Sequence, residues 1–464
     1  MSGRVDQQTG QRIATELRRH PAIAAAAVHG DDRLIAYLVP DRQHAPVVHR
    51  ACRMAAAGSL AGLTLHEPAG ELLVAQLNRT ETDFLYREIF VENTYLRHGI
   101  GLPADPVVVD VGANIGMFSL LVAQRSSGAR IVAVEPVAEL AHAASVNAEL
   151  HGLHVTVLNC GLGSRTDEAA FSYYPNNTLM SGMYGDAEED RAVLRSYLRT
   201  APEAELGAQF DRLVDDRMLA EPRRCQLTTL AEVVATHGIE RIDLLKIDVE
   251  KAEADVLAGI DSATWEKIDQ VVLEVHDLHG RLQAVVDQLR ARGFDTVHEQ
   301  ERRLELTPCH NVYARRPGAR PPALVESRPA QTRAALTSEL RAFATQRLAD
   351  LPLPDEIVWV ARIDAANAPA EIRASALTGR ASTVLSSAWT ALFGAGSDTP
   401  DADFFDLGGG SLTAVRLLAK IEDQLGEEIV EPDLIFTTTR FADLADAIAI
   451  ALRSRDGAGG NDIG

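Results

Sequence analysis

A histidine with acidic residues around it is the group in this sequence best suited to proton chemistry. The segment VVLEVHD places Glu274 and His276 two positions apart on an expected strand, so both side chains face one side of the sheet. Asp248 ends a second expected strand, IDLLKID. An imidazole can accept a proton from a hydroxyl group, and a carboxylate can orient the ring. We therefore take His276 as the candidate base, oriented by Asp248 and accompanied by Glu274. The alternative is that His276 only makes hydrogen bonds at the strand end.

A glycine-rich turn in PVVVDVGANIGMFSLLVAQ joins an apolar strand to an apolar helix. Gly112 and Gly116 allow a ligand to approach the backbone closely. The turn lacks the middle glycine of the G-x-G-x-x-G motif, against which a pyrophosphate sits. The next strand, RIVAVEP, ends in Glu135, an acid suited to a ribose diol. This pattern favours S-adenosylmethionine, which has an adenosine and no pyrophosphate. The alternative is a structural turn in a flavodoxin-like domain.

A single serine follows three glycines in the segment DFFDLGGGSL, at the start of an apolar helical pattern. Ser411 has no neighbouring residue that could activate its hydroxyl. The backbone N–H groups at a helix start favour a phosphate. The pattern therefore suits a serine that a separate enzyme modifies, and the alternative is an N-cap serine on a small helical bundle.

The composition excludes several classes of function. A formal charge of -21 argues against a nucleic-acid partner and against binding to an anionic membrane. The four cysteines form no CxxC pair, so neither a zinc site nor a disulfide framework is expected, and no other metal site is predicted. The N-terminal residues are polar, and no apolar run is long enough to span a bilayer. We expect a cytoplasmic protein.

The chain is long enough for several domains, with 464 residues, and four zones separate along it. The central zone alternates apolar strands with helical stretches, which indicates a parallel α/β sheet. A Pro- and Arg-rich linker follows it, and the C-terminal zone is helical throughout. The expected domains are 1–60 with 333–377, 68–316, and 380–452, followed by a disordered tail at 453–464.

Five segments of the central zone resemble the FkbM family of S-adenosylmethionine methyltransferases in order and spacing. They are DVGANIGMFSL, VAVEP, NCGLG, IDLLKIDVEKAEADVLAGI and IDQVVLEVHD. The resemblance covers about residues 70–315. It implies a Rossmann-like fold with a parallel-rich, seven-stranded sheet, and methylation of oxygen on a small metabolite. The upstream segment NRTETDFLYREIFVENTYLRHGI resembles the entry to such domains inside assembly-line synthetases.

The family resemblance assigns cofactor contacts to the glycine turn and the strand after it. Asp110, Gly112 and Gly116 would line the methionine part, and Asn114 belongs to the same turn. Glu135 would accept hydrogen bonds from the ribose hydroxyls.

The remaining assignments follow later strands. Asn159, Cys160 and Gly161 would border the adenine, and Asp248 would face the methionine amino group or the substrate. Methyl transfer is an in-line displacement for which the protein positions the partners. An alcohol acceptor needs a base, which is the role expected of His276.

The two small flanks resemble the halves of the C-terminal subdomain of an adenylation domain, into which the methyltransferase is inserted. The large ATP-binding subdomain is expected to be absent, because the chain starts at the hinge. Adenylation domains end in a pattern like N-G-K-V-D-R-x-A-L, and aligning EIRASAL with it puts Glu371 at the position of the lysine. A carboxylate would repel the adenylate. We expect a scaffold without adenylation activity.

The segment DADFFDLGGGSLTAVRLLAKI resembles the phosphopantetheine attachment site of a peptidyl or acyl carrier domain, a small four-helix bundle. Gly410 stands where the family often has His or Asp, which bears on the choice of phosphopantetheinyl transferase. The predicted function is O-methylation, including that of an oxime, on an acyl group tethered to Ser411. The acyl group would come from separate adenylation or synthetase modules. The alternatives are N-methylation of a tethered aminoacyl group and an inactive carrier platform.

Overall fold

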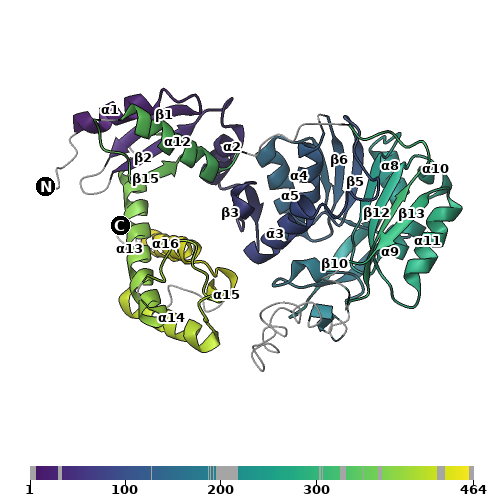
Figure 1. Cartoon of the computed structure of the whole chain (residues 1–464). Coiled ribbons are helices and arrows are strands. Elements are labelled where there is room, and N and C mark those ends of the chain that lie inside the picture. Colours follow the sequence, from purple (N-terminus) through teal and green to yellow (C-terminus); the bar gives the residue numbers. More distant parts are fainter. Residues whose placement is uncertain are drawn as a thin grey trace, which may run out of the picture. The chain divides into compact units, whose positions relative to one another are not determined.

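The structure is a computed structural model of the chain (Figure 1). It describes residues 7–29, 34–126, 128–185, 218–301, 307–323, 331–348, 350–363, 368–394, 396–425 and 434–458, together with positions 188, 190, 191, 193, 194 and 305. The chain divides into two compact units, Met1–Ala361 and Arg362–Gly464.

The first unit is built around a seven-stranded sheet with the order β13-β14-β12-β11-β5-β6-β7. The five consecutive strands β12, β11, β5, β6 and β7 run parallel, and β14 runs antiparallel to both of its neighbours, β12 and β13. The predicted Rossmann-like sheet is therefore confirmed. The strands are β5 (Val107–Val111), β6 (Arg130–Val134), β7 (Val155–Leu158), β11 (Leu244–Ile247), β12 (Gln270–His276), β13 (Asp295–Glu299) and β14 (Cys309–Arg315).

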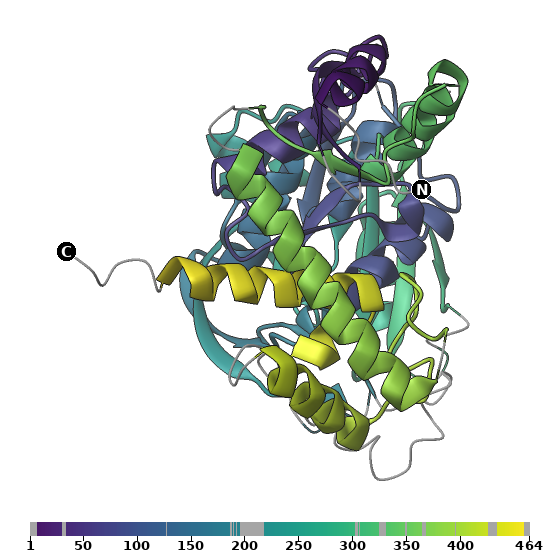
Figure 2. The same cartoon turned by 90° about the vertical axis from the view of Figure 1, so that its left-hand side faces the viewer.

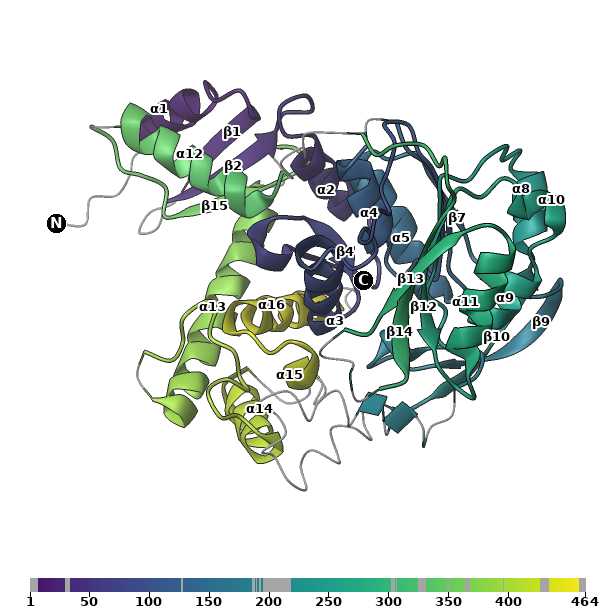
Figure 3. The ribbon, with the colours of Figure 1, turned by 45° about the vertical axis from the view of Figure 1, so that its right-hand side comes forward.

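Helices cover both faces of this sheet (Figure 3). Successive strand residues alternate between two hydrophobic cores, as the period of a strand requires: Val108 belongs to one and Val109 to the other. Both side chains are fully buried, which explains why the strands read as continuous apolar runs. One core includes α4 (Met117–Gln124) and α5 (Ala138–His151); the other includes α8 (Leu230–Thr236), α9 (Glu253–Ala258), α10 (Ser262–Trp265) and α11 (Arg281–Ala291).

Two smaller sheets and several short helices accompany the main sheet. A three-stranded sheet has the order β8-β10-β9, and a hairpin pairs β3 with β4. The elements are β3 (Thr64–His66), η1 (Pro68–Gly70), β4 (Val74–Gln76), α3 (Arg79–Tyr86), η2 (Arg87–Val91), β8 (Gly161–Leu162), β9 (Asp167–Tyr173), η3 (Thr178–Met180) and β10 (Glu221–Thr228).

The two flanks of the methyltransferase-like region meet in one small subdomain. Strand β15 pairs in parallel with β2, which pairs antiparallel with β1. Leu17 of α1 and Leu340 of α12 are buried in the same core, although they come from opposite ends of the unit. The elements are α1 (Gln7–Leu17), β1 (Ile23–His29), β2 (Ile35–Pro40), α2 (Pro46–Ala56), α12 (Arg333–Arg347) and β15 (Glu356–Trp359).

Helix α2 joins this subdomain to the main sheet. Val48 packs into the core of the subdomain, and Met54 packs into one core of the main sheet. The start of α12 is also fixed to the β3–β4 hairpin region: Arg333 pairs with Glu67 at 3.0 Å, and the Thr332 hydroxyl donates to the Gly70 carbonyl. The described part of the first unit therefore packs as a continuous body.

The second unit is a helical bundle. Trp389 is fully buried at its centre and contacts the rings of Phe393, Phe404 and Phe441. Figure 2 shows the long helix α13 crossing α16. The helices are α13 (Ala368–Phe393), α14 (Ser411–Leu425), α15 (Leu434–Thr437) and α16 (Phe441–Ala458).

Two predicted boundaries differ from the structure. The boundary between residues 377 and 380 lies inside α13, because the Ala-rich segment there has high helix propensity. Helix α16 extends to Ala458, into the predicted disordered tail, and residues 459–464 lie outside the described residues. Among the described residues, no helix combines the length and apolar composition needed to cross a bilayer.

Candidate active site

A pocket opens where β5, β6 and β11 end, beside the point where the strand order reverses. The chain runs from β5 outward to β7 and then returns to β11 on the other side of β5, so the crevice lies outside the carboxyl ends of the strands. The pocket encloses about 870 Å³, counted out to its open mouth.

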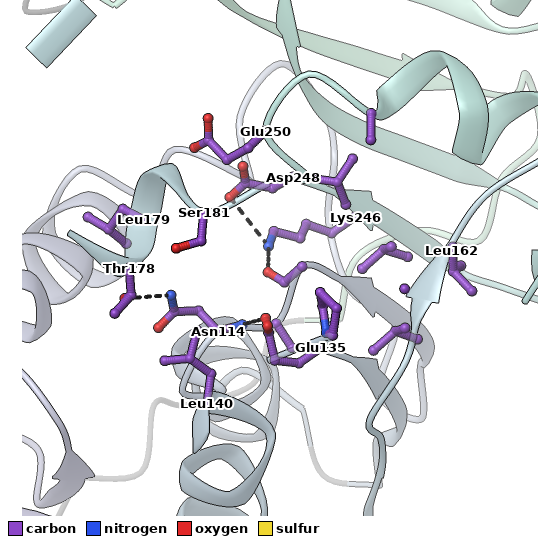
Figure 4. Close-up of a pocket in the computed structure, with 18 of the residues that line it drawn as sticks. Asn114, Glu135, Leu140, Leu162, Thr178, Leu179, Ser181, Lys246, Asp248 and Glu250 are labelled. Atoms are coloured by element: carbon purple, nitrogen blue, oxygen red, sulfur yellow. Dashed lines mark hydrogen bonds and ion pairs between the residues drawn. The ribbon is translucent and has the colours of Figure 1, made fainter. Parts of the chain in front are cut away.

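The predicted glycine turn forms the floor of the pocket (Figure 4). Gly112 has a φ of 77°, and a Cβ there would lie 1.7 Å from the Asp248 carbonyl oxygen. Only glycine therefore permits β5 and β11 to come together at this point. Gly116 also has a positive φ and packs on Ala144, so it serves the helix start and is not among the residues that line the pocket.

Glu135 lies at the end of β6 and lines the pocket, as predicted. Its two carboxylate oxygens accept hydrogen bonds from the backbone N–H groups of Asn114, at 2.8 Å, and Val137, at 2.9 Å. Burial raises the pKa of Glu135 to about 7, although these two bonds oppose the shift. The carboxylate therefore holds the turn in place and keeps lone pairs for a ligand.

A buried lysine, which the sequence analysis did not assign, links three of the groups at the strand ends. Lys246 Nζ lies 2.7 Å from the Gly112 carbonyl, 3.3 Å from Asp110 and 3.5 Å from Asp248. Burial opposes its charge, but Asp110 and Asp248 more than offset this and raise the pKa of Lys246. Asp110 is fully buried and does not line the pocket, so its expected contact with the cofactor is corrected to a contact with Lys246.

Asp248 lines the pocket and is held from two sides. Tyr95 donates its hydroxyl to Asp248 at 2.8 Å, and the Lys246 ammonium lies on the other side. Burial, together with the negative charge of Asp248, raises the pKa of Tyr95 well above 10. The phenol therefore remains a hydrogen-bond donor at neutral pH.

The expected pairing of Asp248 with His276 is wrong. His276 Nε2 lies 3.2 Å from Glu250 and Nδ1 lies 3.0 Å from Glu253, and both carboxylates come from the segment after β11. The imidazole is buried and is not among the pocket-lining residues. Burial opposes its charge, but hydrogen bonds to Cys309, Glu250 and Glu253 raise the pKa of His276 well above 6.5.

Glu250 and Asp248 both line the pocket, whereas Glu274 is not one of the lining residues. Burial, the nearby Cys309 and Asp248 raise the pKa of Glu274 well above 4.5. One oxygen each of Asp248, Glu250 and Glu274 lies within 4.8 Å of the others. Lys246 and His276 adjoin this group, so it has counter-charges without a metal ion.

The assignment of the adenine end needs correction for two residues, Asn159 and Cys160. Asn159 donates to the backbone carbonyls of Glu135 and Pro136, and Cys160 is partly buried against a core. The short strand β8 instead brings Gly161 and Leu162 into the pocket lining. Gly161, one of the three residues expected at this end, therefore lines the pocket, whereas Asn159 and Cys160 do not.

One wall comes from a segment without a sequence motif. Thr178 hydrogen-bonds to Asn114 at 3.3 Å and is anchored to α3 by Glu81. Leu179, Ser181 and other residues of this segment line the pocket (Figure 4).

The residues present fit S-adenosylmethionine. Glu135 offers acceptors for a ribose diol at the end of the second strand. Glu135, Asp248 and Glu250 are the acidic residues among the described lining residues. Lys246 is the one lysine or arginine among them, and its ammonium group already contacts Asp110 and Asp248. A wall with excess negative charge suits a ligand that carries a sulfonium and an ammonium group.

The sheet order and the pocket at the ends of β5, β6 and β11 define a Rossmann-like methyltransferase. Residues 110–296 match the model of the methyltransferase FkbM domain. The chain is 41% identical over 259 residues to 31-O-demethyl-FK506 methyltransferase FkbM of Streptomyces tacrolimicus, which covers 54% of this chain and 96% of the relative. The chain therefore belongs to the FkbM family of methyltransferases, and S-adenosylmethionine is its cofactor.

A second match extends beyond the methyltransferase. The chain is 41% identical over 391 residues to AMB antimetabolite synthetase AmbE of Pseudomonas aeruginosa PAO1, which covers 78% of this chain. The chain spans only 18% of the length of that synthetase. A solved methyltransferase FkbM from Methylobacillus flagellatus KT is 14% identical, with a TM-score of 0.31, over 49% of this chain and 47% of that one.

Residues 384–448 match the phosphopantetheine attachment site, which makes the second unit a carrier domain with 4′-phosphopantetheine as its group. Helix α14 begins at Ser411, as the sequence predicted.

Proposed function

We propose that the chain O-methylates a substrate held as a thioester on its phosphopantetheine arm, and that Ser411 carries this arm. The observation that carries the proposal is the joint presence, in one chain, of a carrier domain and a cofactor pocket with carboxylates at one end. The chemical class of the substrate is a small acyl or aminoacyl group with a free hydroxyl.

Each part of the pocket has a defined task in this reaction. S-adenosylmethionine supplies an electrophilic methyl group on a sulfonium. Glu135 binds the ribose, and Gly112 gives the cofactor access to the backbone. Asp248, held by Tyr95 and Lys246, presents a fixed carboxylate for the ammonium group of the cofactor or for the acceptor. The apolar side chains of Leu85, Ile89, Leu179 and Met183 exclude water from the reacting centre.

The carrier domain supports this function by concentrating the acceptor. A flexible tether raises the effective concentration of its cargo to the order of millimolar. Free substrate would need a comparable concentration to reach the same rate. The acyl group would be loaded by separate adenylation or synthetase modules after a phosphopantetheinyl transferase has modified Ser411. The similarity to a region of a synthetase supports such partners.

We further propose that the small subdomain is a degenerate C-terminal subdomain of an adenylation domain. Its two halves come from either side of the methyltransferase and share one sheet and one core. Glu371, which the alignment places at the lysine position, lies in α13. The contacts of Arg333 and Thr332 with the β3–β4 region support a scaffold role.

The test uses the full chain loaded from synthetic coenzyme A thioesters. A panel of 2-, 3- and 4-hydroxybutyryl groups offers oxygen acceptors, and a 2-aminobutyryl group offers an amine. Intact-protein mass spectrometry with and without S-adenosylmethionine should show one added methyl group on a hydroxyacyl form. Methylation of the aminoacyl form alone would establish N-methylation instead, and methylation of no form would refute the proposal.

A further inference from the structure

One pocket-lining carboxylate, Glu250, is connected to a series of ionisable groups, of which His276 and Glu253 are buried. Its Oε2 lies 3.2 Å from His276 Nε2, and the other ring nitrogen lies 3.0 Å from Glu253 Oε1. Glu253 is fully buried, and its second oxygen lies 3.1 Å from Arg281. The order starting from the pocket is therefore carboxylate, imidazole, carboxylate and guanidinium.

The backbone at Glu250 is held in an uncommon conformation. Glu250 has a φ of 48° and Lys251 a φ of 75°, both in the left-handed region that non-glycine residues rarely adopt. The Lys251 N–H donates to Glu253 Oε1 at 2.8 Å, and Arg281 donates to the Lys251 carbonyl at 2.7 Å. Such strain persists only where the surroundings enforce it, and it clusters at functional sites.

The segment around Gly182, on the opposite wall of the pocket, also packs closely against Glu250. A Cβ at Gly182 would lie 2.8 Å from the Glu250 carbonyl oxygen, so only glycine permits this approach. The Gly182 segment pairs with Ser172 of β9, which fixes it to the three-stranded sheet. Glu250 is thus clamped between two walls while its side chain keeps about a fifth of its surface exposed.

We propose that Glu250 is the catalytic residue that receives the proton of the acceptor hydroxyl, and that His276 acts through it as a positioning residue. This inference rests on the proposed O-methylation. The acceptor O–H bond breaks and its proton passes to a Glu250 oxygen, while a lone pair of the acceptor oxygen forms the O–CH₃ bond. The electron pair of the broken S–CH₃ bond stays on sulfur, which leaves neutral S-adenosylhomocysteine.

The charges around Glu250 set its protonation state. Asp248 and Glu253 face it with negative charge, Glu274 is a further carboxyl group nearby, and His276 is the cation in contact with it. Burial is the main reason why the pKa of Glu250 is raised, and His276 opposes that shift. A carboxylate with a raised pKa is a stronger base, and the neighbouring imidazolium favours its ionised form.

The pH dependence of methyl transfer follows from these signs. The rate should rise with pH as Glu250 ionises, and should fall again at higher pH as His276 loses its proton. Removing His276 takes away the cation beside Glu250, so the acid limb of the profile should move to higher pH. A residue with only a structural role would lower the rate without moving this limb.

The experiment combines rates with a titration that needs no acceptor. Rates are measured on the hydroxybutyryl-loaded full chain between pH 5 and 10 for wild type, Glu250→Gln and His276→Gln. Glu240→Gln, an exposed carboxylate before β11, serves as the control. Carbon-13-labelled histidine, assigned by the signal lost in His276→Gln, gives the titration of His276 by NMR in the chain without acceptor.

Glu250→Gln should lower the rate by about 10²–10⁴-fold, the range for a general base, and should remove the acid limb. It should also lower the pKa of His276 in the NMR titration, whereas Glu240→Gln should change neither quantity. A full rate in Glu250→Gln would overturn the role of Glu250, and an unmoved acid limb in His276→Gln would overturn that of His276. If the NMR titration gives a raised pKa for His276 but the chain methylates only the aminoacyl group, the O-methylation on which the inference rests would be refuted.

Discussion

The pH dependence of cofactor affinity should report the protonation of Glu135. Burial raises the pKa of this carboxyl from 4.5 to about 7 in the folded chain. Its oxygens already accept hydrogen bonds from the N–H groups of Asn114 and Val137, so a ribose diol must use the remaining lone pairs. A protonated carboxyl would place its own O–H group at one of these positions. S-adenosylmethionine should therefore bind the ionised form preferentially.

The magnitude follows from proton linkage. Below a pKa of about 7 the affinity should fall by about tenfold per pH unit, so roughly 10-fold at pH 6 and 100-fold at pH 5. Two charge-assisted hydrogen bonds at about 1.5–3 kcal/mol each are strong enough to sustain this range. The stability of the ligand-free chain should change in the opposite direction. A raised carboxyl pKa favours the folded state at low pH, so this contribution, about 3 kcal/mol, is lost as the pH rises through about 7.

Isothermal titration calorimetry between pH 5 and 7.5 provides the assay, because the amino group of the cofactor stays largely protonated in this range. Glu135→Gln should bind more weakly at pH 7.5 and show a flattened pH dependence. Glu139→Gln, a surface carboxylate in the first turn of α5, should behave like wild type. Equal affinity of the wild-type chain at pH 5.5 and 7.5 would refute the placement of the ribose at Glu135.

Three further predictions concern the turn, the carrier core and the attachment residue. Gly112→Ala should abolish cofactor binding in calorimetry and lower the melting temperature, since the new Cβ would lie 1.7 Å from the Asp248 carbonyl; wild-type affinity would contradict the tight approach of β5 and β11. Trp389→Ala should destabilise the carrier unit by about 3–5 kcal/mol, which hydrogen exchange of the α13 and α16 amides would measure, while cofactor affinity stays unchanged. Ser411→Ala should block attachment of phosphopantetheine in intact-protein mass spectrometry, and Thr413→Ala should retain it; a modified Ser411→Ala chain would disprove the assignment.

Local patterns in the sequence were sufficient for much of the fold and for the ribose end of the site. The runs around Val108 and Val132 are buried on both faces, so they predict parallel strands without knowledge of their neighbours. The glycine turn and Glu135 meet because they end adjacent parallel strands, β5 and β6. Such relations follow from strand order and period alone.

The acceptor end could not be predicted in the same way. The contact of His276 with Glu250 depends on two consecutive left-handed residues after β11, and no sequence rule gives a glutamate and a lysine those conformations. Lys246 was within reach of prediction, because it alternates with Asp248 along one strand and is in register with Asp110. Its burial depended on the packing of Tyr95, which comes from a distant segment.

The position of the transferred methyl group tests the proposed O-methylation most directly. The full chain, loaded with a hydroxyacyl group and supplied with S-adenosylmethionine labelled with carbon-13 in its methyl group, is allowed to react, and the released acyl product is analysed by NMR. We expect the labelled carbon to be bonded to oxygen, Glu250→Gln to slow its appearance, and Ser411→Ala to prevent loading. A label on nitrogen, or no label on the loaded chain despite bound cofactor, would contradict it.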